Sequence, residues 1–122
     1  MTEYLTTIEV LAIHKILIDR YGGSHGLRDA GALESALYRP QTGCYEDLIQ
    51  EAAALWESLS QNHPFIDGNK RAAFGATYTF LSVNGTKIKA NSNEVIIFVK
   101  ELYDNQKFEF KELEIWLRNN TL

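Results

Sequence analysis

The sequence has little of what builds disulfide scaffolds, membrane spans or nucleic-acid surfaces. Its 122 residues include a single cysteine, Cys44, so no intrachain disulfide can form and a reducing compartment is expected. No apolar run approaches the length of a membrane span, and the amino terminus lacks the basic start and apolar core of a signal peptide. The net charge is −4 with no long basic run, which argues against broad nucleic-acid binding. We therefore expect a cytoplasmic protein that contacts no membrane and makes no direct contact with nucleic acid.

The overall composition of the chain is typical of one globular domain. Hydrophobic residues make up 45% and charged residues 23% of the chain, which allows a core of useful size. The length leaves little room for a second domain, and the chain has no internal repeat, linker or low-complexity tract. We expect residues 1–122 to form a single domain.

Apolar residues recur at helical spacing along most of the chain. Thr6 and Glu9 form a capping box before a helix predicted over residues 7–21, and glycines end it. Five more helices are predicted: one from Asp29 to Arg39-Pro40, one from Tyr45 to about Asn62, one from Gly68 or Asn69 to Asn84-Gly85, one capped by Asn91 with Glu94, and one around Leu113 and Leu117. Short connections between six helices indicate a compact all-α bundle. The glycine-rich residues 22–29 are predicted to form an exposed loop or a small hairpin.

One stretch carries most of the chemically useful side chains: His63-Pro64-Phe65-Ile66-Asp67-Gly68-Asn69-Lys70-Arg71. The proline stops one helix, and the next begins near Gly68 or Asn69. A helix start carries partial positive charge and N–H groups without internal partners, so phosphate binds well there. Lys70 and Arg71 in the first turn oppose the helix dipole, and a bound anion would relieve that conflict. The stretch therefore predicts a phosphate site, which Gly68 lets a ligand approach closely.

Two further groups in this stretch suit phosphoryl chemistry. The Asp67 carboxylate suits a Mg²⁺ ion that also takes phosphate oxygens, and His63 can accept a proton from a hydroxyl. The same residues have plainer interpretations: Asp67 as a helix N-cap, His63 as a hydrogen-bonded core residue, and Lys70 and Arg71 as solvated side chains. On the residues alone, both interpretations stay open.

The stretch matches every specified position of H-x-F-x-(D/E)-(G/A)-N-x-R and so closely resembles the signature of the Fic/Doc (Fido) superfamily. Residues 22–29, 33–37 and 39–41 are similar to the amino-terminal region of death-on-curing (Doc) toxins, so the likeness covers almost the whole chain. The resemblance implies a compact α-helical domain in which His63 deprotonates a target hydroxyl and Asp67 binds Mg²⁺. It implies ATP as the nucleotide, with its phosphates held by Gly68, Asn69, Lys70 and Arg71. It further implies a flap that docks the target chain, formed by Gly23, Ser24, His25, Gly26, Leu27 and Arg28.

Two positions depart from the members of the superfamily that transfer AMP. Those enzymes usually have glycine where Lys70 stands and a second arginine where Phe74 stands, and both departures match Doc-type members. The resemblance therefore implies an ATP-dependent protein kinase that transfers the γ-phosphate to a threonine or serine of elongation factor Tu. The alternatives are an AMP transferase, in keeping with Gly68, and a non-catalytic module that binds an antitoxin.

The self-inhibitory motif of some Fic proteins, (S/T)-x-x-x-E-(G/N), is satisfied by no segment of this sequence. If the protein is toxic, restraint has to come from another chain. The resemblance implies a type II toxin-antitoxin system, with a cognate antitoxin and a protein substrate as the partners.

Overall fold

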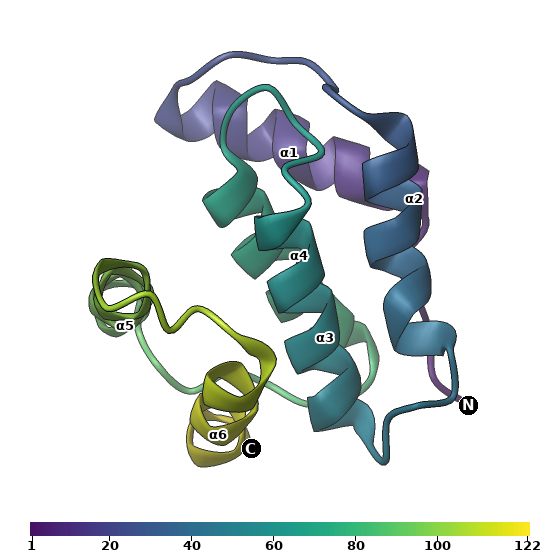
Figure 1. Cartoon of the computed structure of the whole chain (residues 1–122), viewed down its shortest axis with the longest axis vertical. Coiled ribbons are helices and arrows are strands. Elements are labelled where there is room, and N and C mark those ends of the chain that lie inside the picture. The colour runs from purple at the N-terminus through teal and green to yellow at the C-terminus, as the bar shows by residue number, and fades with distance from the viewer.

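A computed structural model describes the whole chain, residues 1–122, as a bundle of six α-helices and one short 3₁₀-helix (Figure 1). The elements are α1 (Thr7–Tyr21), α2 (Ala30–Tyr38), η1 (Arg39–Gln41), α3 (Leu48–Gln61), α4 (Asn69–Val83), α5 (Ser92–Asp104) and α6 (Phe110–Asn120). The predicted all-α bundle of about six helices is confirmed. None of these helices has the length and apolar character needed to cross a membrane.

Side-chain caps fix where most of the helices begin. Both predicted capping boxes form. The side chains of Thr6 and Asn91 each accept the N–H of the glutamate three residues on, and that glutamate's carboxylate accepts the N–H of the capping residue in return. Asp29 caps α2 as predicted. The third helix begins at Leu48, later than the predicted Tyr45, because the Asp47 carboxylate accepts the Gln50 N–H and starts the helix there.

The core is organised around α3, which packs against α2, α4 and α6. Three consecutive alanines of α3, residues 52–54, are buried, and small residues of α4 face the same core. Their small volume lets the helices approach closely, while Trp56 fills the centre and lies edge-on to Trp116 with ring centroids 5.7 Å apart. Because α3 and α4 are fixed in this core, the loop between them is held at both ends.

Residues 22–29 form the loop rather than the hairpin of the two predicted alternatives. The segment runs from the end of α1 to the start of α2 at the upper edge of Figure 1. Its only strand-like pairing is a single antiparallel bridge between Leu27 and Phe65. The glycine-rich segment therefore lies against the loop between α3 and α4 instead of folding back on itself.

Glu57 joins three elements beside the core. One oxygen of its half-buried carboxylate accepts a bond from Arg39 at 2.7 Å, and the other accepts the Phe110 N–H at 2.6 Å. The second bond is important because Glu109, at the N-cap of α6, supplies no side-chain cap of its own. Glu57 thus caps α6 from α3 and holds η1 at the same time.

Replacing Glu57 with alanine is expected to lower the free energy of unfolding by about 1–3 kcal/mol, because a partly buried arginine and a helix N–H both lose a charged partner. Urea denaturation followed by circular dichroism measures the change. The control is Asp104→Ala, which removes an exposed carboxylate paired with Lys100 at 2.6 Å and is expected to cost less than about 0.5 kcal/mol. Equal effects of the two substitutions would contradict the proposed role of Glu57.

Candidate active site

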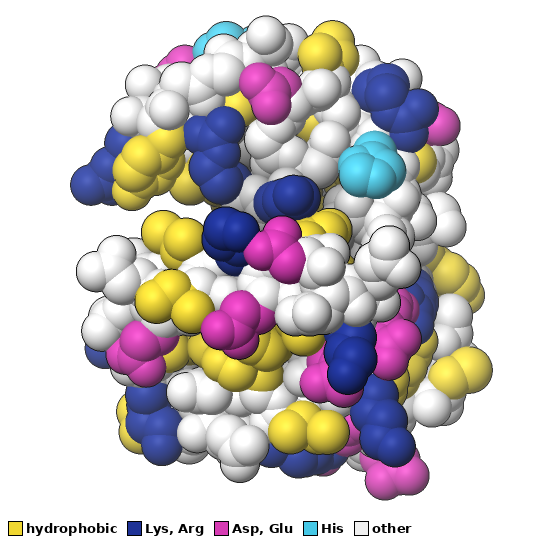
Figure 2. All heavy atoms as spheres, turned by 60° about the vertical axis from the view of Figure 1, so that its left-hand side comes forward, with side chains coloured by type: hydrophobic (Ala, Val, Ile, Leu, Met, Phe, Trp, Pro, Cys, Tyr) yellow, Lys and Arg dark blue, Asp and Glu magenta, His cyan; other side chains and the backbone are white.

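The loop between α3 and α4 and the first turn of α4 surround a cavity of about 410 Å³. Its lining residues are His63, Ile66, Asp67, Gly68, Asn69, Lys70 and Arg71. The structure therefore brings together all the residues predicted for catalysis, metal binding and phosphate binding. Figure 2 shows Lys and Arg side chains gathered around a hollow between the parts of the molecule formed by α1 and α5, although the net charge is negative.

The start of α4 has the form of an anion site. Gly68 is the N-cap, with φ 74° in the left-handed region, and contributes no side-chain cap. The N–H groups of Asn69, Lys70 and Arg71 have no partner within the chain, as the geometry of a helix start dictates. The backbone angle favours glycine at this position, and a Cβ atom there would also lie 2.9 Å from the end of the Ile18 side chain, which would have to shift.

Asn69 holds the loop in shape. Its amide oxygen accepts the Phe65 N–H at 2.9 Å, and its amide nitrogen donates to the Phe65 carbonyl at 2.9 Å. Phe65 is 1% exposed, so both of these backbone groups would otherwise be buried without partners. Both ends of the Asn69 side-chain amide are thus used by hydrogen bonds within the loop. The group of Asn69 that remains available for the predicted contact with phosphate is its backbone N–H.

His63 points its side chain to solvent at the edge of the cavity, which rules out the plainer interpretation as a core histidine. Its backbone lies in the left-handed region, with φ 47°, a conformation rarely adopted by residues other than glycine. Arg28 secures this conformation, because its guanidinium donates to the carbonyls of His63 at 2.6 Å and Asn62 at 2.9 Å. The predicted base is therefore held by its backbone and keeps its ring free.

Asp67 sits between the helix start and the flap. Its two carboxylate oxygens accept the N–H groups of Ser24 at 3.0 Å and Gly68 at 2.8 Å. These bonds hold the pKa of Asp67 below its usual value, and the nearby Arg71 cation adds to the effect. Asp67 is therefore not the N-cap but an ionised, exposed carboxylate.

The residues present fit a Mg²⁺ ion that arrives with a phosphate ligand. An ionised carboxylate whose oxygens each accept one bond keeps lone pairs for a metal. No group of three or more His, Cys, Asp or Glu side chains could hold a metal ion by itself. Mg²⁺ commonly binds through one or two carboxylates, substrate phosphates and water, so Asp67 would hold it with the nucleotide's help.

The flap, residues 22–29, is tied to the site mainly by its backbone. The Gly26 carbonyl accepts the Ile66 N–H at 3.1 Å, and the Arg28 N–H donates to the Pro64 carbonyl at 2.7 Å. At Gly23 a Cβ would lie 2.8 Å from an Asp67 carboxylate oxygen, so this glycine lets the flap pass close to the Asp67 side chain.

Two side-chain contacts hold the flap, one at its first residue and one near its middle. Arg71 donates to the Gly22 carbonyl at 3.0 Å, and so is not simply solvated. The His25 ring lies 2.8 Å from the Asp19 carboxylate, which places it toward α1. Leu27 is 39% exposed and presents its side chain on the outer surface, where a docking chain could reach it.

Sequence reasoning missed two residues that support the site. His14 on α1 is buried, stacks on Phe65 with ring centroids 3.8 Å apart, and contacts the Asp67 carbonyl at 2.7 Å through Nε2, which must carry a proton there. Tyr103 at the end of α5 lies under Lys70, whose ammonium is 4.0 Å from the ring centroid. The position of His14 beside an apolar stripe is only a weak indication in the sequence that it supports the site. No local sequence pattern indicates that Tyr103 does.

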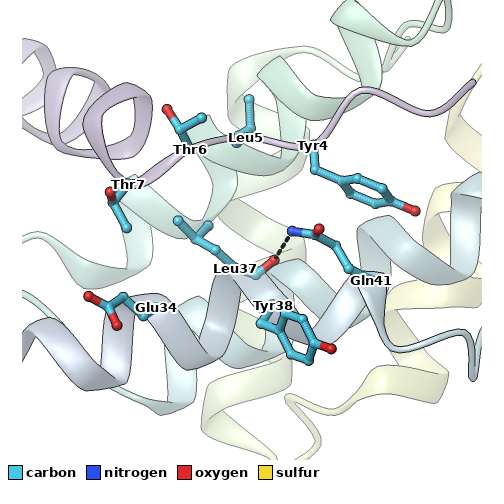
Figure 3. A pocket seen from close by; sticks show the side chains of 8 residues that line it. All are labelled: Tyr4, Leu5, Thr6, Thr7, Glu34, Leu37, Tyr38 and Gln41. Carbon is cyan, nitrogen blue, oxygen red and sulfur yellow. Dashed lines mark hydrogen bonds between the residues drawn. The ribbon is translucent and has the colours of Figure 1, made fainter.

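A second hollow, of about 360 Å³, lies between the chain before α1 and helix α2 (Figure 3). Two of its polar side chains are used by the fold: Gln41 donates to the Leu37 carbonyl at 3.2 Å, and the Tyr4 hydroxyl donates to Glu51 at 2.7 Å. It has no histidine or cation among its lining residues. The chemistry is therefore concentrated at the start of α4.

Comparisons with known proteins agree with the fold and the loop. The chain belongs to the Fic/DOC family, whose family model matches residues 4–81. It is 43% identical to a protein named Toxin Doc from Mycolicibacterium smegmatis, over 75% of this chain and 72% of that protein. It is also 34% identical to Protein kinase doc of Escherichia phage P1, over 70% of this chain and 71% of that protein. The resemblance seen in the motif therefore extends through most of the chain.

Replacing Asn69 with alanine is expected to lower the free energy of unfolding by about 1–3 kcal/mol, because the buried N–H and carbonyl of Phe65 lose their partner. Hydrogen exchange at the Phe65 amide should also become faster, and this localises the effect to the loop. The control is Asn119→Ala, an exposed position near the end of α6, where a change within about 0.5 kcal/mol is expected. Unchanged protection of the Phe65 amide would show that the hydrogen bonds between Asn69 and Phe65 are not what orders the loop.

Proposed function

We propose that this protein is a Doc-like toxin that acts as an ATP-dependent protein kinase. The proposed substrate is a translation factor, elongation factor Tu, whose threonine or serine hydroxyl receives the γ-phosphate. The observation that carries the proposal is the cavity at the start of α4, where an exposed histidine, an ionised carboxylate and three free N–H groups face one space. The names of the two relatives, a toxin and a kinase, support the same conclusion.

The residues of the site divide the work of phosphoryl transfer. The target hydroxyl approaches His63, which takes its proton as the oxygen forms a bond to the γ-phosphorus and the bond to the bridging oxygen breaks, releasing ADP. The start of α4 and the cations of Lys70 and Arg71 stabilise the negative charge on the phosphates. Mg²⁺ held by Asp67 would neutralise further charge on the nucleotide.

Positions 70 and 74 favour phosphate transfer over AMP transfer. Lys70 places a cation beside the cavity, where it would add charge for a terminal phosphate. Phe74 is half-buried against Trp56, with ring centroids 5.4 Å apart, so this turn of α4 packs into the core and supplies no second cation. AMP transfer is the second candidate because Gly68 follows the broader Fic form.

The same proposal includes a cytoplasmic setting and restraint by a partner. Because the sequence contains no self-inhibitory helix motif, a cognate antitoxin bound to this chain would have to cover the site. A non-catalytic role, limited to antitoxin binding, would leave toxicity independent of His63.

The test uses purified translation factor, Mg²⁺ and ATP labelled at either the α or the γ phosphate. The wild-type chain should transfer label from the γ position only, and His63→Ala should reduce the rate at least about 100-fold, because the general base is lost. His63→Asn is the companion variant, since asparagine tolerates the left-handed backbone but cannot act as the base. Transfer from the α position alone would establish AMP transfer, and unaltered activity of both variants would refute the assigned mechanism.

A further inference from the structure

Lys70 has one aromatic partner and no acidic one. Its ammonium lies 4.0 Å from the centroid of the Tyr103 ring, although the two residues belong to different helices, α4 and α5. None of the ion pairs of the molecule involves Lys70. A cation at this distance from a ring face is attracted by the negative face of the π-system.

The Tyr103 ring is itself fixed by the core. It stacks on Phe108 with centroids 4.5 Å apart and planes inclined by 18°, and Phe108 is buried beside Trp56. One face of a ring cannot hold both a stacked phenyl group and an ammonium at these distances, so Tyr103 lies between Phe108 and Lys70. Burial raises the pKa of the Tyr103 phenol, which keeps the side chain neutral at physiological pH.

We propose that Tyr103 is a positioning residue for Lys70, and that it strengthens binding of the terminal phosphate of the nucleotide. The inference rests on the proposed function, which it extends to a residue outside the motif. A lysine side chain loses much rotamer freedom when it is fixed, and a ring that already holds it reduces the loss on binding. Lys70 is among the residues that line the cavity, so a ring that holds its ammonium would keep the charge beside that cavity.

An aromatic partner also preserves the charge that the site needs. A carboxylate would hold the ammonium equally well but would offset its charge and repel phosphate. A neutral ring orients the cation through its quadrupole and leaves the full positive charge available. Tyr103 thus orients the Lys70 ammonium without neutralising its charge, which an acidic partner would do.

The experiment measures the binding of a non-hydrolysable ATP analogue and of AMP, each with Mg²⁺, to the full chain. Tyr103→Leu should weaken binding of the ATP analogue about two- to thirty-fold, the range that a cation–π contact allows, and leave AMP binding unchanged. Tyr103→Phe keeps the ring and should stay within about two-fold of wild type. In a Lys70→Met background, Tyr103→Leu should have no further effect, because the partner is absent.

Phe98→Leu is the matched control. Phe98 lies on the same helix, stacks on Trp116 with centroids 4.9 Å apart and makes no cation–π contact with Lys70. Its loss should lower stability without changing the preference for ATP over AMP. A nuclear magnetic resonance measurement without nucleotide completes the test: the ε-methylene protons of Lys70 should show a ring-current shift that Tyr103→Leu removes and Tyr103→Phe retains.

The outcomes separate this inference from the proposed function. If wild type binds ATP and Tyr103→Leu binds it equally well or more tightly, the positioning role is overturned and the kinase proposal stands. The positioning role is also overturned if Phe98→Leu weakens ATP binding as much as Tyr103→Leu does, or if Lys70 shows no ring-current shift. If wild type binds no nucleotide, the proposed function fails and the role of Tyr103 fails with it.

Discussion

The pair of hydrogen bonds between the Asn69 amide and the Phe65 backbone is the constraint on which the rest of the site depends. Because both ends of the amide are used, the loop between α3 and α4 is closed into one shape before any ligand arrives. Within that loop the Asp67 carboxylate lies beside the flap and the first N–H groups of α4 face the cavity, while Arg28 holds His63 in its left-handed conformation. Pre-organised groups of this kind need little rearrangement when charge develops on a transferred phosphoryl group.

The positive charges of Lys70 and Arg71 at the start of α4 do not stabilise the helix, but they would attract an anion. Lys70 and Arg71 lie at the positive end of a helix, where they gain nothing from the dipole. Each is held by a neutral group, Lys70 by an aromatic ring and Arg71 by the Gly22 carbonyl. The single carboxylate at the site, Asp67, faces the flap and keeps its charge. A phosphate bound together with a metal ion would complete the electrostatic balance of this site.

Most of the local structure could be predicted from the sequence because it is coded by neighbouring residues. The capping boxes at Thr6 and Asn91 and the stop at Pro64 rely on contacts within a few positions, and the structure confirms each of them. The predicted start of α3 is wrong because the apolar pattern runs through Tyr45, while the Asp47 cap decides the boundary. The hairpin alternative fails because residues 22–29 pair with the loop around Phe65 rather than with each other, a choice that no local pattern encodes.

The same distinction holds within the site. The motif gathers the cavity-lining residues because they are adjacent in the chain. The engagement of Asn69 with Phe65, the contact of His14 with Asp67 and the contact of Tyr103 with Lys70 depend on how the loop and the helices pack, and sequence spacing does not reveal it.

The bond from the Ser24 N–H to the Asp67 carboxylate makes the flap part of the electrostatic environment of Asp67. A chain that docks on the flap and shifts Ser24 would alter the affinity of Asp67 for a cation. By thermodynamic linkage, a cation bound at Asp67 would then change the affinity of the flap for that chain by the same factor. One backbone hydrogen bond would therefore couple a cation bound at Asp67 to a chain docked on the flap.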